Sequence, residues 1–205
     1  MLAPECGTLF LVVGPSGSGK DTLLDGARVA LRMDSGFVFP RRVITRPSDA
    51  GGEDHIAATS EEFDAHRDAG AFALHWTANG HAYGVPNSIE RDLDAGRSVV
   101  VNVSRTVIDE ARMRLTPVRV ILLTVSDEVL AQRLSARGRE TRPEIEARLA
   151  RARAFRISGN DVVEISNDGA APEAIMRFVA VLSDSARHRP PSGAATAAVA
   201  TERSV

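Results

Sequence analysis

The 205-residue chain has one cysteine, one lysine, few aromatic residues and no long apolar run. Its single cysteine, Cys6, cannot form an internal disulfide, which excludes a disulfide-stapled miniature. No stretch approaches the roughly 20 consecutive apolar residues that a membrane helix needs. The N-terminus carries Glu5 and no basic side chain, so we expect no secretory signal and a cytoplasmic location.

A large net charge is also lacking. The chain has 27 acidic and 25 basic residues, for a net charge of −2, so no global positive field attracts nucleic acid or anionic lipid. We therefore expect neither nucleic acid nor a membrane as a partner. The hydrophobic share of 43% is enough for a real core. At roughly 150 residues per domain, the length fits one α/β domain with an extra lobe or tail.

Apolar segments that suit strands alternate with amphipathic segments that suit helices. Strands are expected at 8–13, 37–44, 99–103, 118–125 and 161–165, and helices at 21–33, 106–114, 127–136, from 141 onward and at 172–185. This order predicts an α/β fold with a doubly wound parallel sheet of about five strands.

The remaining segments define the domain boundaries. The irregular stretch 46–97 predicts a small acceptor-binding lobe, in which Asn79-Gly80 suits a hairpin turn. Residues 187–205 contain no Leu, Ile, Phe or Met and predict a disordered tail. The catalytic domain is thus expected at 7–186.

One glycine-rich segment lies between an expected strand and an expected helix. It consists of Gly14, Pro15, Ser16, Gly17, Ser18, Gly19 and Lys20. The pattern G-x-x-x-x-G-K in this context is typical of a P-loop, whose backbone N–H groups point at phosphate oxygens beside a helix N-terminus. The lysine must reach the β- and γ-phosphates, which suits a compact ammonium better than a broad guanidinium. Lys20 is the one lysine among 25 basic residues, so we expect ATP here rather than an unliganded turn.

The residue after this lysine differs from the usual Ser or Thr. Asp21 stands there and Thr22 follows. A carboxylate is a good ligand for a hard cation, so we expect Asp21 to hold Mg²⁺, with Thr22 beside it. The alternative is that Asp21 only favours the first turn of a helix.

Arginines are concentrated in a segment at 133–156, which we expect to form a lid. No Ser-His-Asp, Cys-His or zinc-type cluster stands out, which fits phosphoryl transfer by positioning and charge neutralisation. Arg137, beside Gly138, and Arg148 are the expected catalytic arginines of that lid. Arg151, Arg153 and Arg156 are expected to be solvated.

Several motifs together resemble the guanylate kinase-like branch of P-loop kinases over about residues 8–182. They are GPSGSGK, ITRP at 44–47, Glu61-Glu62-Phe63, YGVP at 83–86, RLxxRGRE at 133–140, ARLARA at 147–152 and Asn167-Asp168. The resemblance implies that Arg46 and Tyr83 hold an acceptor phosphate, that Arg137 and Arg148 belong to a lid, and that Asn167 lies near adenine.

The departures from that family concern the acceptor. Leu74 stands where guanylate kinases carry an acid for the guanine edge, and Asn102 and Ser104 stand near a second acidic position. Leucine cannot accept hydrogen bonds, so guanine would be left with unpaired donors. Ser48-Asp49 replaces a second arginine, and His55 replaces a tyrosine.

A narrower set of motifs is similar to the ribose 1,5-bisphosphate phosphokinases: GPSGSGKD, ITRP, GGEDHIA, ANGxxYGV and VNVSR. That similarity implies transfer of the γ-phosphoryl group of ATP to the 1-phosphate of ribose 1,5-bisphosphate, giving 5-phosphoribosyl 1-diphosphate during phosphonate degradation. Arg42 and His55 are then candidates for the 5-phosphate, against surface charge and core packing as the alternatives. Trp76 is expected to be packing only.

Three alternatives remain at this point, and the oligomeric state stays open. The first is a guanylate or other nucleoside monophosphate kinase, which Leu74 disfavours. The second is a non-catalytic guanylate kinase-like module that binds a peptide, which the complete P-loop with Lys20 disfavours. The third is a regulatory nucleotide hydrolase, for which no water-positioning residue is apparent.

Overall fold

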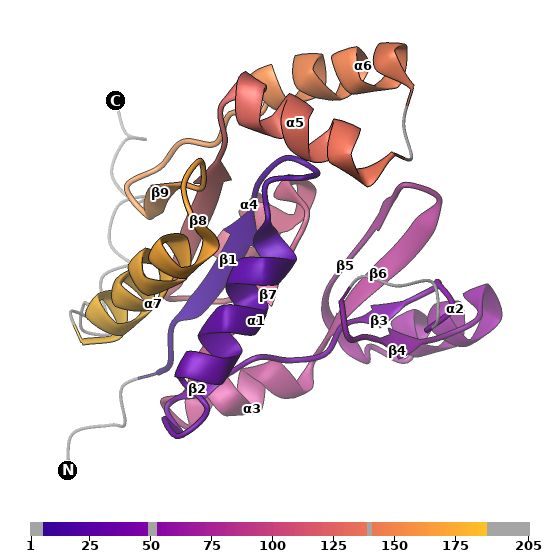
Figure 1. Cartoon of the computed structure of the whole chain (residues 1–205). Helices are drawn as coiled ribbons and strands as arrows, with labels where there is room; N and C mark the ends of the chain where they lie inside the picture. The colour runs from indigo at the N-terminus through magenta and orange to yellow at the C-terminus, as the bar shows by residue number, and fades with distance from the viewer. Residues whose placement is uncertain (1–5, 49–52, 139–140, 188–205) are drawn as a thin grey trace, which may run out of the picture.

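The computed structural model describes residues 6–48, 53–138 and 141–187, without the side chains of Arg137 and Arg187. A parallel five-stranded sheet of order β2-β7-β1-β8-β9 forms its centre (Figure 1). The strands are β1 (Leu9–Val13), β2 (Phe37–Val38), β7 (Ser98–Asn102), β8 (Val118–Thr124) and β9 (Val162–Ser166).

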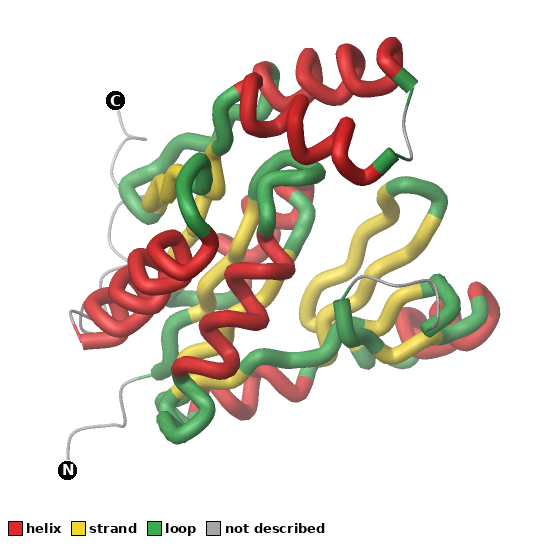
Figure 2. Tube along the Cα trace, viewed as in Figure 1, coloured by secondary structure: helices red, strands yellow, loops and turns green. Residues whose placement is uncertain are grey.

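Helices cover both faces of this sheet (Figure 2). Alternate residues of β1 point to opposite faces: Phe10 and Val12 join the core beneath α1 and α7, while Leu9, Leu11 and Val13 join the core beneath α4. The predicted doubly wound sheet of five strands is therefore confirmed. The helices are α1 (Lys20–Ala30), α3 (Ser88–Asp94), α4 (Ile108–Arg114), which follows the short helix η1 (Arg105–Val107), and α7 (Ala171–Arg187).

A second, mixed sheet of order β4-β3-β6-β5 forms the lobe, with α2 packed against it. Asn79 and Gly80 both have positive φ, 51° and 78°, which suits the tight hairpin turn predicted there. The lobe elements are β3 (Val43–Ile44), β4 (Ile56–Ala57), α2 (Ser60–Asp68), β5 (Phe72–Ala78) and β6 (His81–Pro86).

Two boundary predictions were wrong. The expected strand at 37–44 is divided, since β2 pairs with β7 in the central sheet and β3 pairs with β4 and β6 in the lobe. Pro40 lies between the two halves, and a proline cannot donate to a strand ladder. The lobe consequently begins with β3, before the expected boundary at 46. The predicted tail lies outside the described residues, except for Arg187 at the end of α7.

Two further helices, α5 (Asp127–Arg137) and α6 (Arg142–Arg153), form a hairpin beyond the P-loop end of the sheet (Figure 1). Gly138 ends α5 with φ 63°, and the Thr141 N–H donates to the Glu144 carboxylate at 2.7 Å where α6 starts. None of the residues in α6 is buried. The second helix of the hairpin thus packs on few apolar contacts, whereas α5 is anchored by the fully buried Leu130 and Leu134.

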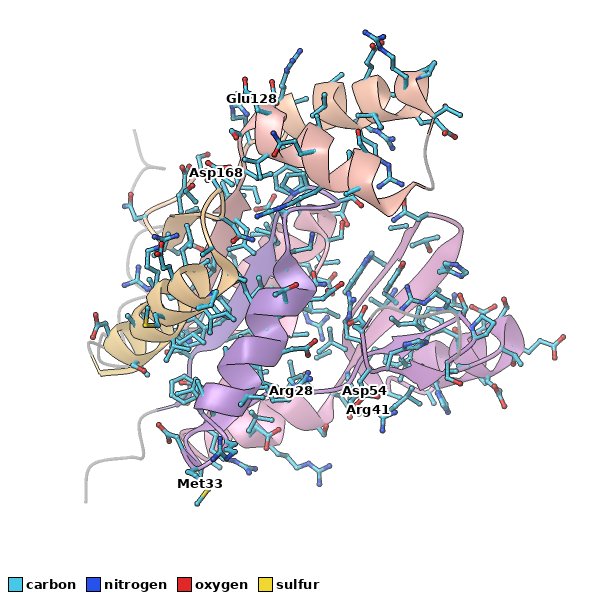
Figure 3. The ribbon with its side chains drawn as sticks, in the orientation of Figure 1. Arg28, Met33, Arg41, Asp54, Glu128 and Asp168 are labelled. Atoms are coloured by element: carbon cyan, nitrogen blue, oxygen red, sulfur yellow. The ribbon has the colours of Figure 1, made fainter. Side chains whose placement is uncertain are left out.

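The start of α5 is tied to the end of β9. Asp168, labelled in Figure 3, accepts a hydrogen bond from the Ser126 N–H at 2.7 Å and one from the Ser166 hydroxyl at 3.0 Å. These hydrogen bonds lower the pKa of the Asp168 carboxyl.

No helix among the described residues is long and apolar enough to cross a membrane.

The packing of α1 against α7 generates a test of what holds the P-loop helix in place. A side chain at Gly26 would overlap Ile175 of α7. Gly26→Val should therefore lower the free energy of unfolding by about 1–3 kcal/mol through overpacking. Ala30→Val, on an exposed position of the same helix, controls for the helix propensity of valine. Urea unfolding of the two variants measures the difference, and equal destabilisation would contradict a tight contact.

Candidate active site

A cavity of about 500 Å³ lies where the P-loop, the lobe and α6 meet. The P-loop follows β1, and β7 ends beside it, since Val12 of β1 pairs with Asn102 at the end of β7. Ligands of open α/β sheets bind at these carboxyl ends, at the point where the strand order reverses. The cationic side chains that line the cavity are Lys20, Arg42, Arg46, Arg105, Arg148 and Arg151.

The P-loop has the backbone its glycines permit. Gly17 and Gly19 have φ 92° and 89°, a region that other residues rarely adopt. The Lys20 ammonium donates to the carbonyls of Gly14 at 2.9 Å and Pro15 at 3.0 Å, at the mouth of the loop. Burial lowers the pKa of Lys20 to about 8, the nearby Asp21 opposing the shift. The predicted strand, loop and helix are present in the predicted order.

Asn167 supports the P-loop from beneath. Its buried side-chain amide donates to the Ser18 carbonyl at 2.7 Å, and Arg133 donates to the Asn167 carbonyl at 2.7 Å. Asn167 and Ser18 are both outside the set of residues that line the cavity. Its amide thus holds the loop, while the position of Asn167 near adenine stays a prediction.

The expected metal-binding residues lie at the cavity wall. Asp21 and Thr22 both line it, and the Asn102 amide donates to the Asp21 carboxylate at 3.3 Å. Kinases bind Mg²⁺ through one or two carboxylates together with substrate phosphates. A carboxylate with a hydroxyl and an amide beside it supplies oxygen donors of that kind, so these residues fit the ion.

Arg148 connects α6 to the P-loop. Its guanidinium donates a hydrogen bond to the Ser16 hydroxyl at 2.8 Å. Arg151 is exposed, as expected, and also lines the cavity, whereas Arg153 pairs with Asp127 at 2.7 Å. The Arg137 side chain lies outside the described part of the structure.

Arg46 and Tyr83 both line the cavity, on its lobe side. The Nε and Nη2 atoms of Arg46 are buried and have no hydrogen-bond partner among the described residues. A buried, unpaired guanidinium is costly unless an anion satisfies it. Both residues of the predicted acceptor-phosphate pair thus line one cavity, and their contact with a phosphate stays a prediction.

The two residues expected at a second phosphate are engaged otherwise. Both ring nitrogens of the buried His55 lie within hydrogen-bond distance of carbonyls, those of Glu53 at 2.9 Å and Arg46 at 3.0 Å. His55 is not in the cavity wall, so its predicted phosphate contact is corrected to support of the loop. Arg42 does line the cavity, but it forms an ion pair with the Glu53 carboxylate.

Sequence reasoning missed Trp76, Glu53 and Arg105. Trp76 stacks on Tyr83 in the cavity wall, with ring centroids 5.4 Å apart and planes at 2°. A signal for this pair existed, because a hairpin turn at Asn79-Gly80 places residue 76 opposite residue 83. Glu53 lies in the irregular part of the sequence, where no periodicity indicates what a side chain faces, whereas Arg105 stands just past the carboxyl end of the expected strand at 99–103, a position that could have indicated it.

The chain matches the guanylate kinase family model over residues 7–170. It is 48% identical over 178 residues to the ribose 1,5-bisphosphate phosphokinase of Thiobacillus denitrificans, covering 87% of this chain and 94% of that protein. It is 54% identical over 151 residues to the enzyme of that name from Acidiphilium cryptum, covering 74% and 80%. The crystal structure of guanylate kinase from Anaplasma phagocytophilum shares the fold, with a TM-score of 0.63, 22% identity and coverage of 88% and 86%. The chain thus belongs to the guanylate kinase family of P-loop kinases, within the group of ribose 1,5-bisphosphate phosphokinases.

Proposed function

We propose that this protein transfers the γ-phosphoryl group of ATP to the 1-phosphate of ribose 1,5-bisphosphate, giving 5-phosphoribosyl 1-diphosphate and ADP. The observation that carries this proposal is the guanidinium of Arg46, which has two buried nitrogens without a hydrogen-bond partner in the described part of the chain and lies in the cavity that also contains Lys20 of the P-loop. One cavity thereby offers a site for a donor phosphate and a site for an acceptor phosphate. The relatives named for this reaction support the choice of acceptor.

The donor half consists of the P-loop and the lid. The inward N–H groups of Gly14–Lys20 would hold the β- and γ-phosphates, with the Lys20 ammonium between them. Arg148 is already at the loop through Ser16, so a small closing movement of α6 would bring it against the transferring group. Arg148 and Arg137 would then stabilise charge on the equatorial oxygens.

The chemical step needs no general base. A sugar phosphate loses its second proton near pH 6, so an oxygen of the 1-phosphate is already anionic at neutral pH. That oxygen attacks the γ-phosphorus, the bond from the γ-phosphorus to the β,γ-bridging oxygen breaks, and ADP leaves with the electron pair. Arg46 and Tyr83 would orient the attacking phosphate in line.

Mg²⁺ is the expected cofactor, held by Asp21 with Thr22 beside it. When bound, the ion neutralises charge on the β- and γ-phosphate oxygens. The Asn102 amide fixes the rotamer of Asp21 through its hydrogen bond, so the carboxylate is oriented before the nucleotide arrives.

A guanine acceptor is less compatible with the lobe. Leu74 is fully buried in the core and is not in the cavity wall, so it offers nothing to the polar edge of the base. Trp76, 8% exposed and stacked on Tyr83, fills part of the wall instead. A base would have to displace this packing without gaining hydrogen bonds.

The direct test measures ADP release with ATP and Mg²⁺, offering ribose 1,5-bisphosphate and GMP in parallel. Phosphorus NMR then identifies the product. Turnover of the sugar bisphosphate to a 1-diphosphate, with none of GMP, is the expected result. Turnover of GMP alone would indicate a nucleoside monophosphate kinase. Inactivity with both acceptors would favour a non-catalytic binding module.

The lowered pKa of Lys20 predicts an alkaline limb in the rate profile. In the free enzyme this pKa is about 8, so kcat/KM for ATP should fall as pH rises above about 8, when the ammonium loses its proton. Bound phosphates favour the charged form, so the limb of kcat should lie at higher pH. A pH profile from 6.5 to 10 measures both, and coincident limbs would contradict the assignment. Lys20→Ala should remove both limbs and lower kcat by at least ~100-fold.

Asp21→Ala should raise the Mg²⁺ concentration needed for half-maximal rate by about tenfold or more, since a carboxylate ligand is lost. Asp25→Ala, one turn along α1 and paired only with Arg28 on the surface, is the matched control. The measurement is initial rate against free Mg²⁺ at fixed ATP. An unchanged Mg²⁺ requirement, with reduced helix stability, would assign Asp21 to the helix N-terminus alone.

A further inference from the structure

Glu53 is an unexpected residue in the cavity wall. Among the described residues that line the cavity, six are cationic, and only Asp21 and Glu53 carry a carboxylate. Asp21 is accounted for as a ligand of Mg²⁺. Glu53 lies on the lobe side, where the substrate brings phosphates, and two negative charges at close range repel each other. Glu53 therefore does not bind a phosphate, and its carboxylate must contact a different part of the substrate.

The carboxylate is held in one orientation. Arg42 donates to it through Nε, at 3.0 Å, and through Nη2, so both oxygens are engaged on one side. The next two residues fix the backbone: Arg41 pairs with Asp54 at 3.1 Å, as the labelled side chains of Figure 3 illustrate, and donates to the His55 carbonyl at 2.9 Å. Few side chains on a loop are fixed at so many points.

Arg42 is fixed in turn by two aromatic rings. Its guanidinium carbon lies 5.4 Å from the centroid of Trp76 and 5.1 Å from that of Tyr83. The two rings are stacked on each other, and Arg42 is 5% exposed. The ion pair and the rings thus form one rigid polar and aromatic surface, of the kind that binds sugars through stacking and planar hydrogen-bonding groups.

This surface can recognise hydroxyl groups. A carboxylate offers about four acceptor positions and Arg42 occupies two, while the two hydrogen bonds to Glu53 use Nε and Nη2 of Arg42 and leave Nη1 out. A hydroxyl both donates and accepts, so it can satisfy both groups. An ionised phosphate cannot donate to a carboxylate. Glu53 therefore favours the sugar and disfavours an anion at the same point.

The position of the Arg42–Glu53 pair in the cavity indicates which ribose hydroxyl it would bind. The Arg42 guanidinium lies 5.1 Å from the ring centroid of Tyr83, which with Arg46 would hold the acceptor phosphate, and Arg42, Glu53 and Lys20 line the same cavity. In the proposed substrate, carbon 1 carries the acceptor phosphate and carbon 2 carries the adjacent hydroxyl. That hydroxyl is the one nearest the reacting group.

We propose that Glu53, oriented by Arg42 on the Trp76–Tyr83 pair, accepts a hydrogen bond from the 2-hydroxyl of the ribose and makes the enzyme selective for ribose over 2-deoxyribose bisphosphates. This inference rests on the proposed function, because it names the part of that substrate which the lobe recognises. Arg42 and Glu53 are then substrate-binding residues, and the predicted phosphate role of Arg42 becomes a role toward a hydroxyl.

The experiment compares ribose 1,5-bisphosphate with 2-deoxyribose 1,5-bisphosphate as acceptors in the wild-type protein and in Glu53→Gln. The wild type should prefer ribose by about 10- to 100-fold in kcat/KM, the range for a hydrogen bond to a charged group. Glu53→Gln should lower kcat/KM for ribose by a similar factor and leave the deoxy substrate within about 3-fold. Glu61→Gln, an exposed acid of α2 in the same lobe and outside the cavity wall, is the matched control and should keep the preference.

Trp76 provides a readout that does not depend on turnover. It is the single tryptophan of the chain, and it lies in the cavity wall, so its fluorescence should report acceptor binding. Titration with each bisphosphate gives the two Kd values for each variant. The loss of preference should appear in Kd as well as in kcat/KM if Glu53 binds the hydroxyl in the ground state.

The outcomes separate the inference from the function beneath it. A wild type that uses ribose and 2-deoxyribose bisphosphates equally well overturns the role of Glu53 and leaves the phosphokinase activity standing. Equal losses for both sugars in Glu53→Gln would mean that Glu53 only neutralises Arg42, and an altered Mg²⁺ requirement would make it a metal ligand. Inactivity of the wild type toward both sugars overturns the proposed function and this inference together.

Discussion

Mutual repulsion among the cations around one cavity is the constraint on which the rest of the site depends. At an effective dielectric near a protein surface, two like charges 4 Å apart repel by about 4 kcal/mol. The fold fixes the charges one by one: Lys20 on the carbonyls of its own loop, Arg148 on Ser16, and Arg42 on a carboxylate and two rings. Arg46 is the exception, since two of its nitrogens are buried without a partner in the described structure. The unbalanced charge is thus concentrated where an acceptor phosphate would bind.

The two halves of the cavity are built in different ways, and this separates their chemistry. The donor half is backbone at the end of a buried parallel strand, supported from beneath by the amide of Asn167. The acceptor half is side chains on a small mixed sheet, whose hairpin register decides what stands opposite Tyr83. Backbone geometry changes little when side chains are replaced. A kinase of this architecture can therefore change its acceptor through a few lobe residues while its phosphate donor site stays the same.

The sequence was sufficient for the donor half and insufficient for the acceptor half, for physical reasons. The P-loop, its strand and its helix are local, since spacing and glycine content define them within one continuous segment. The support that Asn167 gives the P-loop could not be predicted, because its contact with Ser18 joins residues 149 positions apart. The same applies to His55, where a buried packing role and a phosphate role have the same signature in sequence. Trp76 could have been placed from the predicted hairpin, whereas no periodic pattern precedes Glu53.

Charge alone cannot make such a site specific. Phosphates are alike on every substrate, so a cavity lined by guanidinium groups binds many phosphorylated metabolites, and discrimination must come from what separates the phosphates. A hydrophobic wall distinguishes an added or missing hydroxyl only weakly, but a buried group that expects a hydrogen bond rejects a partner that cannot make it. Glu53 and Arg42 form such a group against the aromatic pair. Each residue holds the other in the cavity wall, so a substrate that lacks the hydroxyl leaves their free hydrogen-bonding positions unpaired. The ion pair thus converts a general anion cavity into one that can recognise the sugar between two phosphates.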